Sequence, residues 1–199
     1  MLPPIVVKLG GSLTDSTPLG SLLEEVCAAR CQLVIVPGGG PFANAVRAAQ
    51  ARHGFSDLAA HRMAMVAMAQ YGLMLADLAA KPWRTAWSAE AVQDELARAA
   101  ATPIVWLPDP SRDALELAAS WNVTSDTLAL WLAARLSARR LVLVKSCQRP
   151  ASEDLPALTA AGIVDASFAA LAKQQPEVVA TLVYQASASA LRAALTEAI

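Results

Sequence analysis

Two short apolar segments near the start of the chain run directly into glycine-rich turns. The first reads IVVKLGGS over residues 5–12, and the second reads LVIVPGGG over residues 33–40. Short β-branched runs of this kind predict buried strands, and consecutive glycines let the backbone turn sharply and approach a ligand. Parallel sheets bind ligands at the carboxyl ends of their strands, so the two turns predict two ligands held side by side.

The rest of the chain alternates between strand and helix patterns. Strands are predicted over residues 5–8, 32–37, 85–87, 103–107, 141–145 and 178–183. Helices are predicted over residues 18–30, 41–52, 57–80, 89–100, 124–138, 165–174 and 187–198, with a loop over residues 146–156. Asp57 is the expected N-cap of the longest helix. This alternation favours a single α/β domain over residues 1–199, a three-layer α/β/α sandwich with a mainly parallel central sheet.

Composition narrows the possible function classes. The net charge of -1 offers no basic surface for nucleic acid. Gln70 and Asp77 interrupt the most apolar window, residues 63–80, which indicates a buried helix and no membrane contact. The three cysteines lack metal-ligand spacing, so we expect a reduced, cytoplasmic chain without a metal site of its own.

Lys8 gives the first glycine turn its chemical character. A lysine that ends an apolar strand needs an anionic partner, and the N–H groups of Gly10, Gly11 and Ser12 can bind phosphate oxygens. The chain has no Walker A pattern, so a nucleotide would bind by another scheme. Lys145 follows its own apolar strand in the same way, at the edge where sheet ligands collect.

The segment SWNVTSDTLA at residues 120–129 places polar side chains where an apolar helix begins. On spacing alone it is a capping motif, in which Thr124 or Ser125 is the N-cap and Asp126 lies near the positive end of the helix dipole. The functional alternative is that Asp126 accepts hydrogen bonds from a lysine and orients it. Trp121 is the tryptophan expected near a ligand.

A dinucleotide-binding interpretation is also open. Gly38, Gly40 and Ala43 fit the G-x-G-x-x-A fingerprint after a strand. That fingerprint needs an acidic residue at the end of the next strand, whereas Asp57 precedes a helix. A nicotinamide-dependent oxidoreductase is therefore the less favoured alternative.

Four motifs taken together resemble the amino acid kinase superfamily. They are VKLGGS at 7–12, PGGG at 37–40, TSDTLA at 124–129 and LVLVKS at 141–146, in the order typical of that superfamily. The short length, HRMAM at 61–65 and SWNVTSD at 120–126 most resemble its small archaeal and methylotroph branch. That branch includes a kinase acting on (5-(aminomethyl)furan-3-yl)methyl phosphate in methanofuran biosynthesis.

The resemblance implies an ATP-dependent kinase that uses Mg²⁺ and transfers a γ-phosphoryl group to an oxyanion acceptor. A phosphomonoester is the acceptor best suited, because it is already ionised and needs no general base. The implied catalytic residues are Lys8, Asp126 and Lys145. The implied ATP-binding residues are Gly10, Gly11, Ser12, Lys145 and Ser146. The implied acceptor-binding residues are Gly38, Gly39, Gly40, Arg62, Asn122, Thr124 and Ser125.

The sequence departs from the family pattern after Lys145. Cys147-Gln148-Arg149-Pro150 stands where the family usually has Val-Asp-Gly-Val, and a later Gly-Gly-Met-Gly-x-Lys segment is absent. A nucleotide- or ligand-binding or storage protein of this fold is therefore a second alternative.

The helix that opens at His61 suggests how the chain assembles. Its window 63–80 is apolar nearly all round, more than one buried face requires. A two-fold contact would cover the excess. We therefore expect a homo-oligomer built on dimers, with the first turn of this helix near the acceptor.

Overall fold

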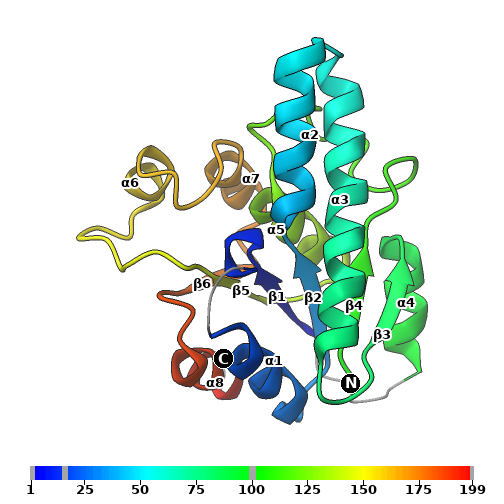
Figure 1. The fold of residues 1–199 in the computed structure, drawn as a ribbon. Coiled ribbons are helices and arrows are strands. Elements are labelled where there is room, and N and C mark those ends of the chain that lie inside the picture. Colours follow the sequence, from blue (N-terminus) through cyan, green and yellow to red (C-terminus); the bar gives the residue numbers. More distant parts are fainter. Residues whose placement is uncertain (1–2, 15–17, 99–101, 198–199) are drawn as a thin grey trace.

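The computed structural model describes residues 3–14, 18–98 and 102–197. Within them lies one six-stranded sheet in the order β3-β4-β2-β1-β5-β6, with every neighbouring pair parallel. The strands are β1 (Ile5–Leu9), β2 (Leu33–Pro37), β3 (Arg84–Trp87), β4 (Ile104–Leu107), β5 (Arg140–Val144) and β6 (Val179–Val183). The expected mainly parallel sheet is confirmed (Figure 1).

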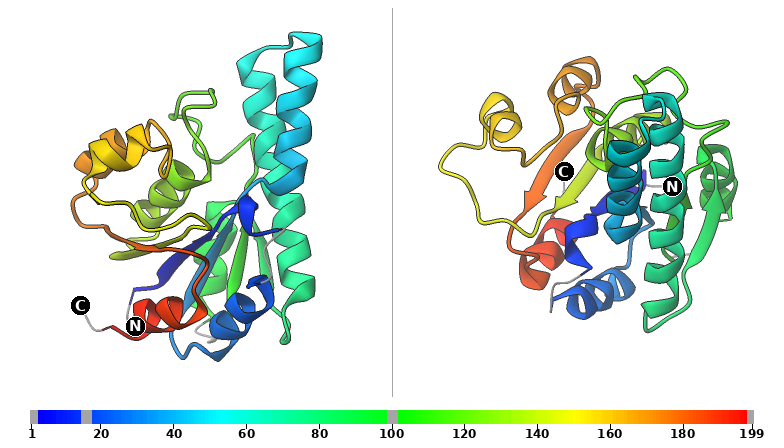
Figure 2. Two further views of the ribbon diagram at one scale, coloured as in Figure 1. Left: turned by 60° about the vertical axis from the view of Figure 1, so that its left-hand side comes forward. Right: turned by 45° about the horizontal axis from the view of Figure 1, so that its top comes forward.

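Helices cover both faces of the sheet, which confirms the three-layer sandwich (Figure 2). The α-helices are α1 (Leu19–Ala28), α2 (Gly40–His53), α3 (Asp57–Leu78), α4 (Ala89–Ala97), α5 (Ser125–Arg135), α6 (Leu155–Ala160), α7 (Phe168–Gln174) and α8 (Ala188–Thr196). Apolar residues of α1, α8 and the second half of α3 pack on one face. Those of α4, α5, α6 and α7 pack on the other.

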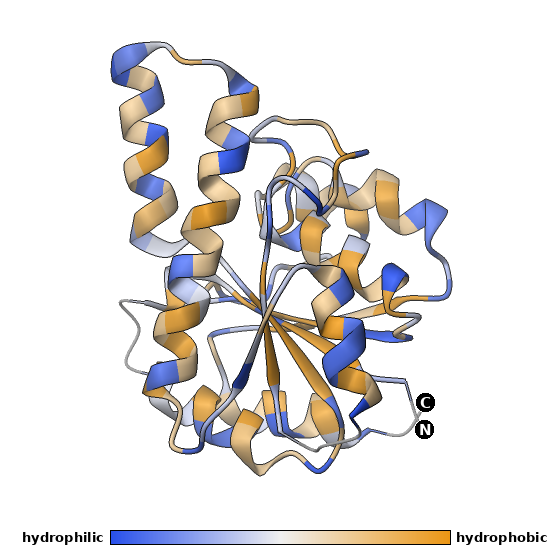
Figure 3. Cartoon of the chain, turned by 90° about the vertical axis from the view of Figure 1, so that its right-hand side faces the viewer, coloured by the Kyte–Doolittle hydropathy of each residue, from blue (hydrophilic) through white to orange (hydrophobic). Residues whose placement is uncertain are grey.

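The alternation of side chains along each strand produces these two cores. Val6, Val34 and Leu141 face the α5 side, whereas Val7 and Ile35 face the α1 side. Because both faces are covered, the inner strands β1, β2, β4 and β5 are mostly buried and apolar (Figure 3).

The connections after β1 and β5 leave the sheet on opposite faces. β1 leads to α1, and the adjacent β5 leads to α6 and α7 on the other side. Ligands of open α/β sheets bind at such a switch point, beyond the carboxyl ends of the strands. Helices α2 and α3 form a long antiparallel hairpin that rises beyond this same edge (Figure 1).

Three local features differ from what the sequence pattern predicts. The N-cap of α3 is Ser56, whose Oγ accepts from the Ala59 N–H, and Asp57 is the first helical residue. Helix α6 begins at Leu155, inside the predicted loop, because Asp154 caps it. The short 3-10 helix η1 (Gly11–Leu13) was not predicted at all. In the part of the chain that the structure describes, no helix is long and apolar enough to cross a membrane.

Candidate active site

Lys8, Asp126 and Lys145 form a buried ionic cluster at the switch point. Lys8 Nζ lies 2.9 Å from Asp126 Oδ1, and Lys145 Nζ lies 2.7 Å from Asp126 Oδ2. Strand pairing sets this arrangement, since β1 and β5 are adjacent and each lysine stands at or just past the end of its strand. Asp126 reaches both from the first turn of α5. The predicted role of Asp126 in orienting lysines is therefore geometrically available.

The cluster carries one more positive than negative charge. Burial raises the pKa of Asp126, but the ammonium groups of Lys8 and Lys145 outweigh burial and hold it below its usual value. Burial and the neighbouring Lys8 charge lower the pKa of Lys145 to about 8, against the opposing pull of Asp126. A buried unpaired cation is energetically unfavourable unless an anion binds next to it, so the cluster is suited to binding an anion.

The two glycine turns pack directly against each other beside this cluster. A Cβ on Gly11 would lie 2.2 Å from the Gly40 nitrogen, and one on Gly38 would lie 2.2 Å from the Gly11 nitrogen. Only glycine permits this approach without backbone movement. Gly38 therefore lies at the contact between the two turns. It does not line the neighbouring cavity that holds Gly39 and Gly40.

A cavity of about 320 Å³ opens over the cluster. It brings together seven predicted site residues: Lys8, Gly10, Gly11, Ser12, Asp126, Lys145 and Ser146. The Ser146 hydroxyl donates to Ser12 Oγ at 2.9 Å, which joins the loops after β5 and β1. Ala161, Gly162 and Ile163 form the opposite wall. We call this space the donor cavity.

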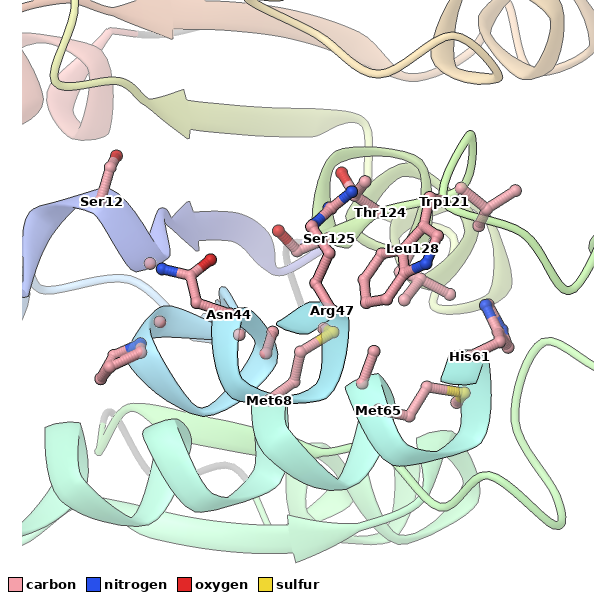
Figure 4. A pocket seen from close by; sticks show the side chains of 17 residues that line it. Ser12, Asn44, Arg47, His61, Met65, Met68, Trp121, Thr124, Ser125 and Leu128 are labelled. Carbon is pink, nitrogen blue, oxygen red and sulfur yellow. The ribbon is translucent and has the colours of Figure 1, made fainter. Parts of the chain in front are cut away.

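A second cavity of about 290 Å³ adjoins the donor cavity, sharing Gly11 and Ser12 with it. We call it the acceptor cavity (Figure 4). Its lining includes the predicted residues Gly39, Gly40, Thr124 and Ser125. Met65, Met68 and Leu128 supply apolar wall, and α3 contributes His61. Two ligands can therefore meet at the Gly10–Ser12 turn.

Arg47 is a charged residue of the acceptor cavity that is not among the residues predicted from the sequence. Its guanidinium carbon lies 3.9 Å from the ring centroid of Trp121. The Trp121 indole N–H donates to Gln50 Oε1 at 2.6 Å, and the Gln50 amide donates to Asp57 Oδ1 at 2.8 Å. The hydrogen bonds hold the Trp121 ring, and the exposed Arg47 side chain stacks on it. Burial lowers the pKa of His61, so His61 is neutral at pH 7 and Arg47 carries the charge.

Besides Gly38, two predicted acceptor residues lie outside both cavities. Arg62 is on the exposed face of α3, and the helical rotation from His61 turns it away from the acceptor cavity. Asn122 is also exposed, and its backbone carbonyl accepts from the Ser167 N–H. Ala43, Arg47 and Gln50 follow the second glycine turn at intervals of four and three residues, so they lie on one face of a helix. This spacing is the sequence signal that could have identified Arg47.

The donor cavity fits nucleotide phosphates in charge and in backbone donors. It holds two ammonium groups, and its single carboxylate, Asp126, is already bound by both of them. Among residues 3–14, 18–98 and 102–197, no group of three or more His, Cys, Asp or Glu could hold a metal ion.

Comparison with known proteins agrees with the geometry. The model of the amino acid kinase family matches residues 3–148. The (5-(aminomethyl)furan-3-yl)methyl phosphate kinase of Methanocaldococcus jannaschii is 30% identical over 143 residues, which is 69% of this chain and 63% of that protein. The chain thus matches less than two thirds of the length of this relative.

Solved structures share the fold at low sequence identity. Uridylate kinase from Archaeoglobus fulgidus has a TM-score of 0.66 at 15% identity, over 99% of this chain and 97% of that one. UMP kinase from Bacillus anthracis has a TM-score of 0.71 at 14% identity, over 98% and 93%.

Proposed function

This chain belongs to the amino acid kinase family, and on that premise we propose that it is an ATP-dependent kinase of small phosphomonoesters. The observation that carries the proposal is the buried pair of lysines sharing Asp126 beside two interlocked glycine turns. In the proposed reaction the γ-phosphoryl group of Mg-ATP passes to a phosphate oxygen of the acceptor, giving ADP and a diphosphate ester.

The site supports this chemistry through charge and position. Phosphoryl transfer needs alignment and charge neutralisation more than covalent help. Lys8 would contact the transferring group, and Lys145 would hold the nucleotide phosphates. The N–H groups of the Gly10–Ser12 turn supply fixed dipoles where charge develops. A phosphate acceptor is already an anion, so the transfer does not depend on a general base.

The acceptor to test first is (5-(aminomethyl)furan-3-yl)methyl phosphate. The relative from Methanocaldococcus jannaschii is named for that substrate, and we propose that this chain acts on the same or a similar compound in methanofuran biosynthesis. The acceptor cavity supports a small phosphate ester with an apolar body, since Arg47 lies among apolar and aromatic side chains. The three free thiols suit a reducing compartment such as the cytoplasm.

Two measurements test the proposal against its alternatives. A thermal-shift experiment with Mg-ATP and with NAD separates a kinase from an oxidoreductase, and stabilisation by NAD alone overturns the proposal. ADP release is then measured with the furan phosphate, UMP, other phosphomonoesters and carboxylates. Binding of ATP without transfer to any phosphate ester would make the chain a binding or storage protein.

The lowered pKa of Lys145 predicts an alkaline limit to activity. The ammonium form binds phosphate, and it is lost as the pH rises through about 8 in the free protein. We expect kcat/KM for ATP to be level below that pH and to fall above it. At saturating ATP the limit of kcat moves to higher pH, because bound phosphate favours the ammonium form. Initial rates between pH 6 and 10 check this, and a flat kcat/KM profile contradicts it.

Arg47→Met should weaken acceptor binding and spare the nucleotide. Methionine keeps apolar contact with Trp121 but removes the guanidinium that the acceptor phosphate would pair with. Loss of one charge-assisted contact predicts about a tenfold or larger rise in acceptor KM. Arg62→Met on the exposed face of α3 is the matched control. Equal acceptor KM values in the two variants would exclude Arg47 from the site.

The exposed face of α3 supports a homodimer. Met63, Val66 and Leu73 are each more than two-fifths exposed and lie on one side of the helix. We propose that a second copy covers them. Light scattering at micromolar concentration should give a dimer-based mass, and Val66→Glu should shift it towards the monomer. A monomeric wild-type protein would exclude this assembly.

A further inference from the structure

The Asp165 carboxylate joins two helices at the edge of the donor cavity. Asp165 Oδ2 accepts from the Thr124 N–H, the Thr124 hydroxyl and the Thr127 N–H, at 2.9, 2.8 and 3.0 Å. Its Oδ1 accepts from the Thr127 hydroxyl at 2.5 Å and from the N–H groups of Ser167 and Phe168, both at 3.1 Å. One side chain therefore accepts six hydrogen bonds.

These contacts replace the caps that both helices lack. Thr124 is the N-cap residue of α5 and Ser167 that of α7, yet neither makes a side-chain hydrogen bond to its own helix. The first N–H groups of a helix need an acceptor, and Asp165 supplies it for both helices at once. The rotation and depth of the first turn of α5 are therefore set by Asp165.

That first turn carries Asp126. Asp126 is the second residue of α5, between Thr124 and Thr127, and its two oxygens face Lys8 and Lys145. Asp165 itself follows the segment 161–163, which forms a wall of the donor cavity. The Asp165 carboxylate thus connects the wall of the donor cavity to the helix turn that carries Asp126, the residue that binds both lysines.

We infer that Asp165 is a positioning residue for phosphoryl transfer, which holds Asp126 at the distance where it orients Lys8 and Lys145. This inference rests on the proposed function. Shifts of about 1 Å in such a group reduce rates by up to a hundredfold. The negative charge of Asp165 also helps keep Lys145 protonated, because it raises the Lys145 pKa against the effects of burial and Lys8.

Asp165→Asn is the direct test. An amide has one acceptor oxygen, and its NH₂ group would face N–H and O–H donors, so the contacts to α5 and α7 cannot both persist. We expect kcat to fall roughly ten- to a hundredfold. We also expect the alkaline limb of kcat/KM for ATP to move to lower pH. Of the three charged groups that shift the Lys145 pKa, only Lys8 and Asp126 would then remain.

Asp154→Asn is the matched control, because Asp154 caps α6 through the Ala157 N–H without any contact to the cluster. Because Asn caps a helix about as well as Asp, the variant should change the melting temperature little and leave both kcat and the pH profile unchanged. If Asp165→Asn behaves in the same way, Asp165 is a structural cap and the inference is wrong.

Thr127→Val keeps the test decisive if Asp165→Asn does not fold. Valine preserves the shape of this buried side chain and removes only the hydroxyl bound to Asp165 Oδ1. A folded Thr127→Val protein should show a smaller fall in kcat, and an unchanged kcat would overturn the inference. If the wild-type protein binds ATP but transfers phosphate to no acceptor, the proposed function is wrong. That outcome is distinct from the one that overturns the inference, in which wild type is active and the variants keep its kcat.

Discussion

Lys8→Ala is expected to abolish phosphoryl transfer while the protein stays folded. Lys8 is buried at the end of β1, and its ammonium faces both Asp126 and the donor cavity. Removing it leaves Asp126 paired with Lys145, so no unpaired carboxylate is left behind. A charged contact made in the transition state is typically worth a few kcal/mol, or about a hundredfold or more in rate.

The turnover of the purified variant tests the loss of phosphoryl transfer, and its thermal unfolding tests whether the protein stays folded. Lys173→Ala, an exposed lysine in the last turn of α7, is the control for loss of one positive charge. It should match wild type in both measurements. Near-normal turnover in Lys8→Ala would remove Lys8 from the mechanism, and a grossly unfolded variant would show that the lysine is needed for structure.

The architecture is predictable from the sequence because short local patterns determine most of it. The apolar strands are buried on both faces, so they appear in the sequence as continuous β-branched runs such as IVV and LVIV. The glycines mark the two turns, and the lysines mark the strand ends. Once the strands are parallel and β1 neighbours β5, Lys8 and Lys145 must lie on one edge.

The missed features depend on contacts between distant parts of the chain. Trp121 and Gln50, whose hydrogen bond holds the ring that Arg47 stacks on, are 71 residues apart, and Asp165 caps a helix that begins 40 positions earlier, at Ser125. Helical spacing from the second glycine turn is a local signal for Arg47, but the contact with Trp121 and the capping by Asp165 depend on the folded chain. Arg62 is the sequence-based choice because its helix follows the second glycine turn and its guanidinium suits an anion. Adjacent helical residues, however, point about 100° apart. His61 therefore points into the acceptor cavity, whereas Arg62 is exposed to solvent.

Asp126→Asn is expected to lower the rate far more than a helix-dipole role allows. A first-turn acid that only complements the dipole contributes about 0.3–1 kcal/mol. Asp126 instead neutralises two buried ammonium groups. Its replacement leaves Lys8 and Lys145 without the anion that binds both of them, so we expect the pKa of Lys145 to fall further below its present value of about 8. Near neutral pH the variant then loses both the geometry and part of the charge that transfer requires.

The same change gives Asp126→Asn a distinctive dependence of stability on pH. A lysine whose folded pKa is depressed binds fewer protons when folded than when unfolded, so stability rises with pH between the folded and unfolded pKa values. In wild type this rise from Lys145 begins near pH 8, and in the variant it should begin at lower pH. Glu90→Gln, an exposed first-turn acid of α4, is the control and should show neither effect. Urea unfolding and initial rates across pH 6 to 9 measure both. An Asp126→Asn protein that melts earlier at every pH yet transfers phosphate normally would assign Asp126 to helix capping alone.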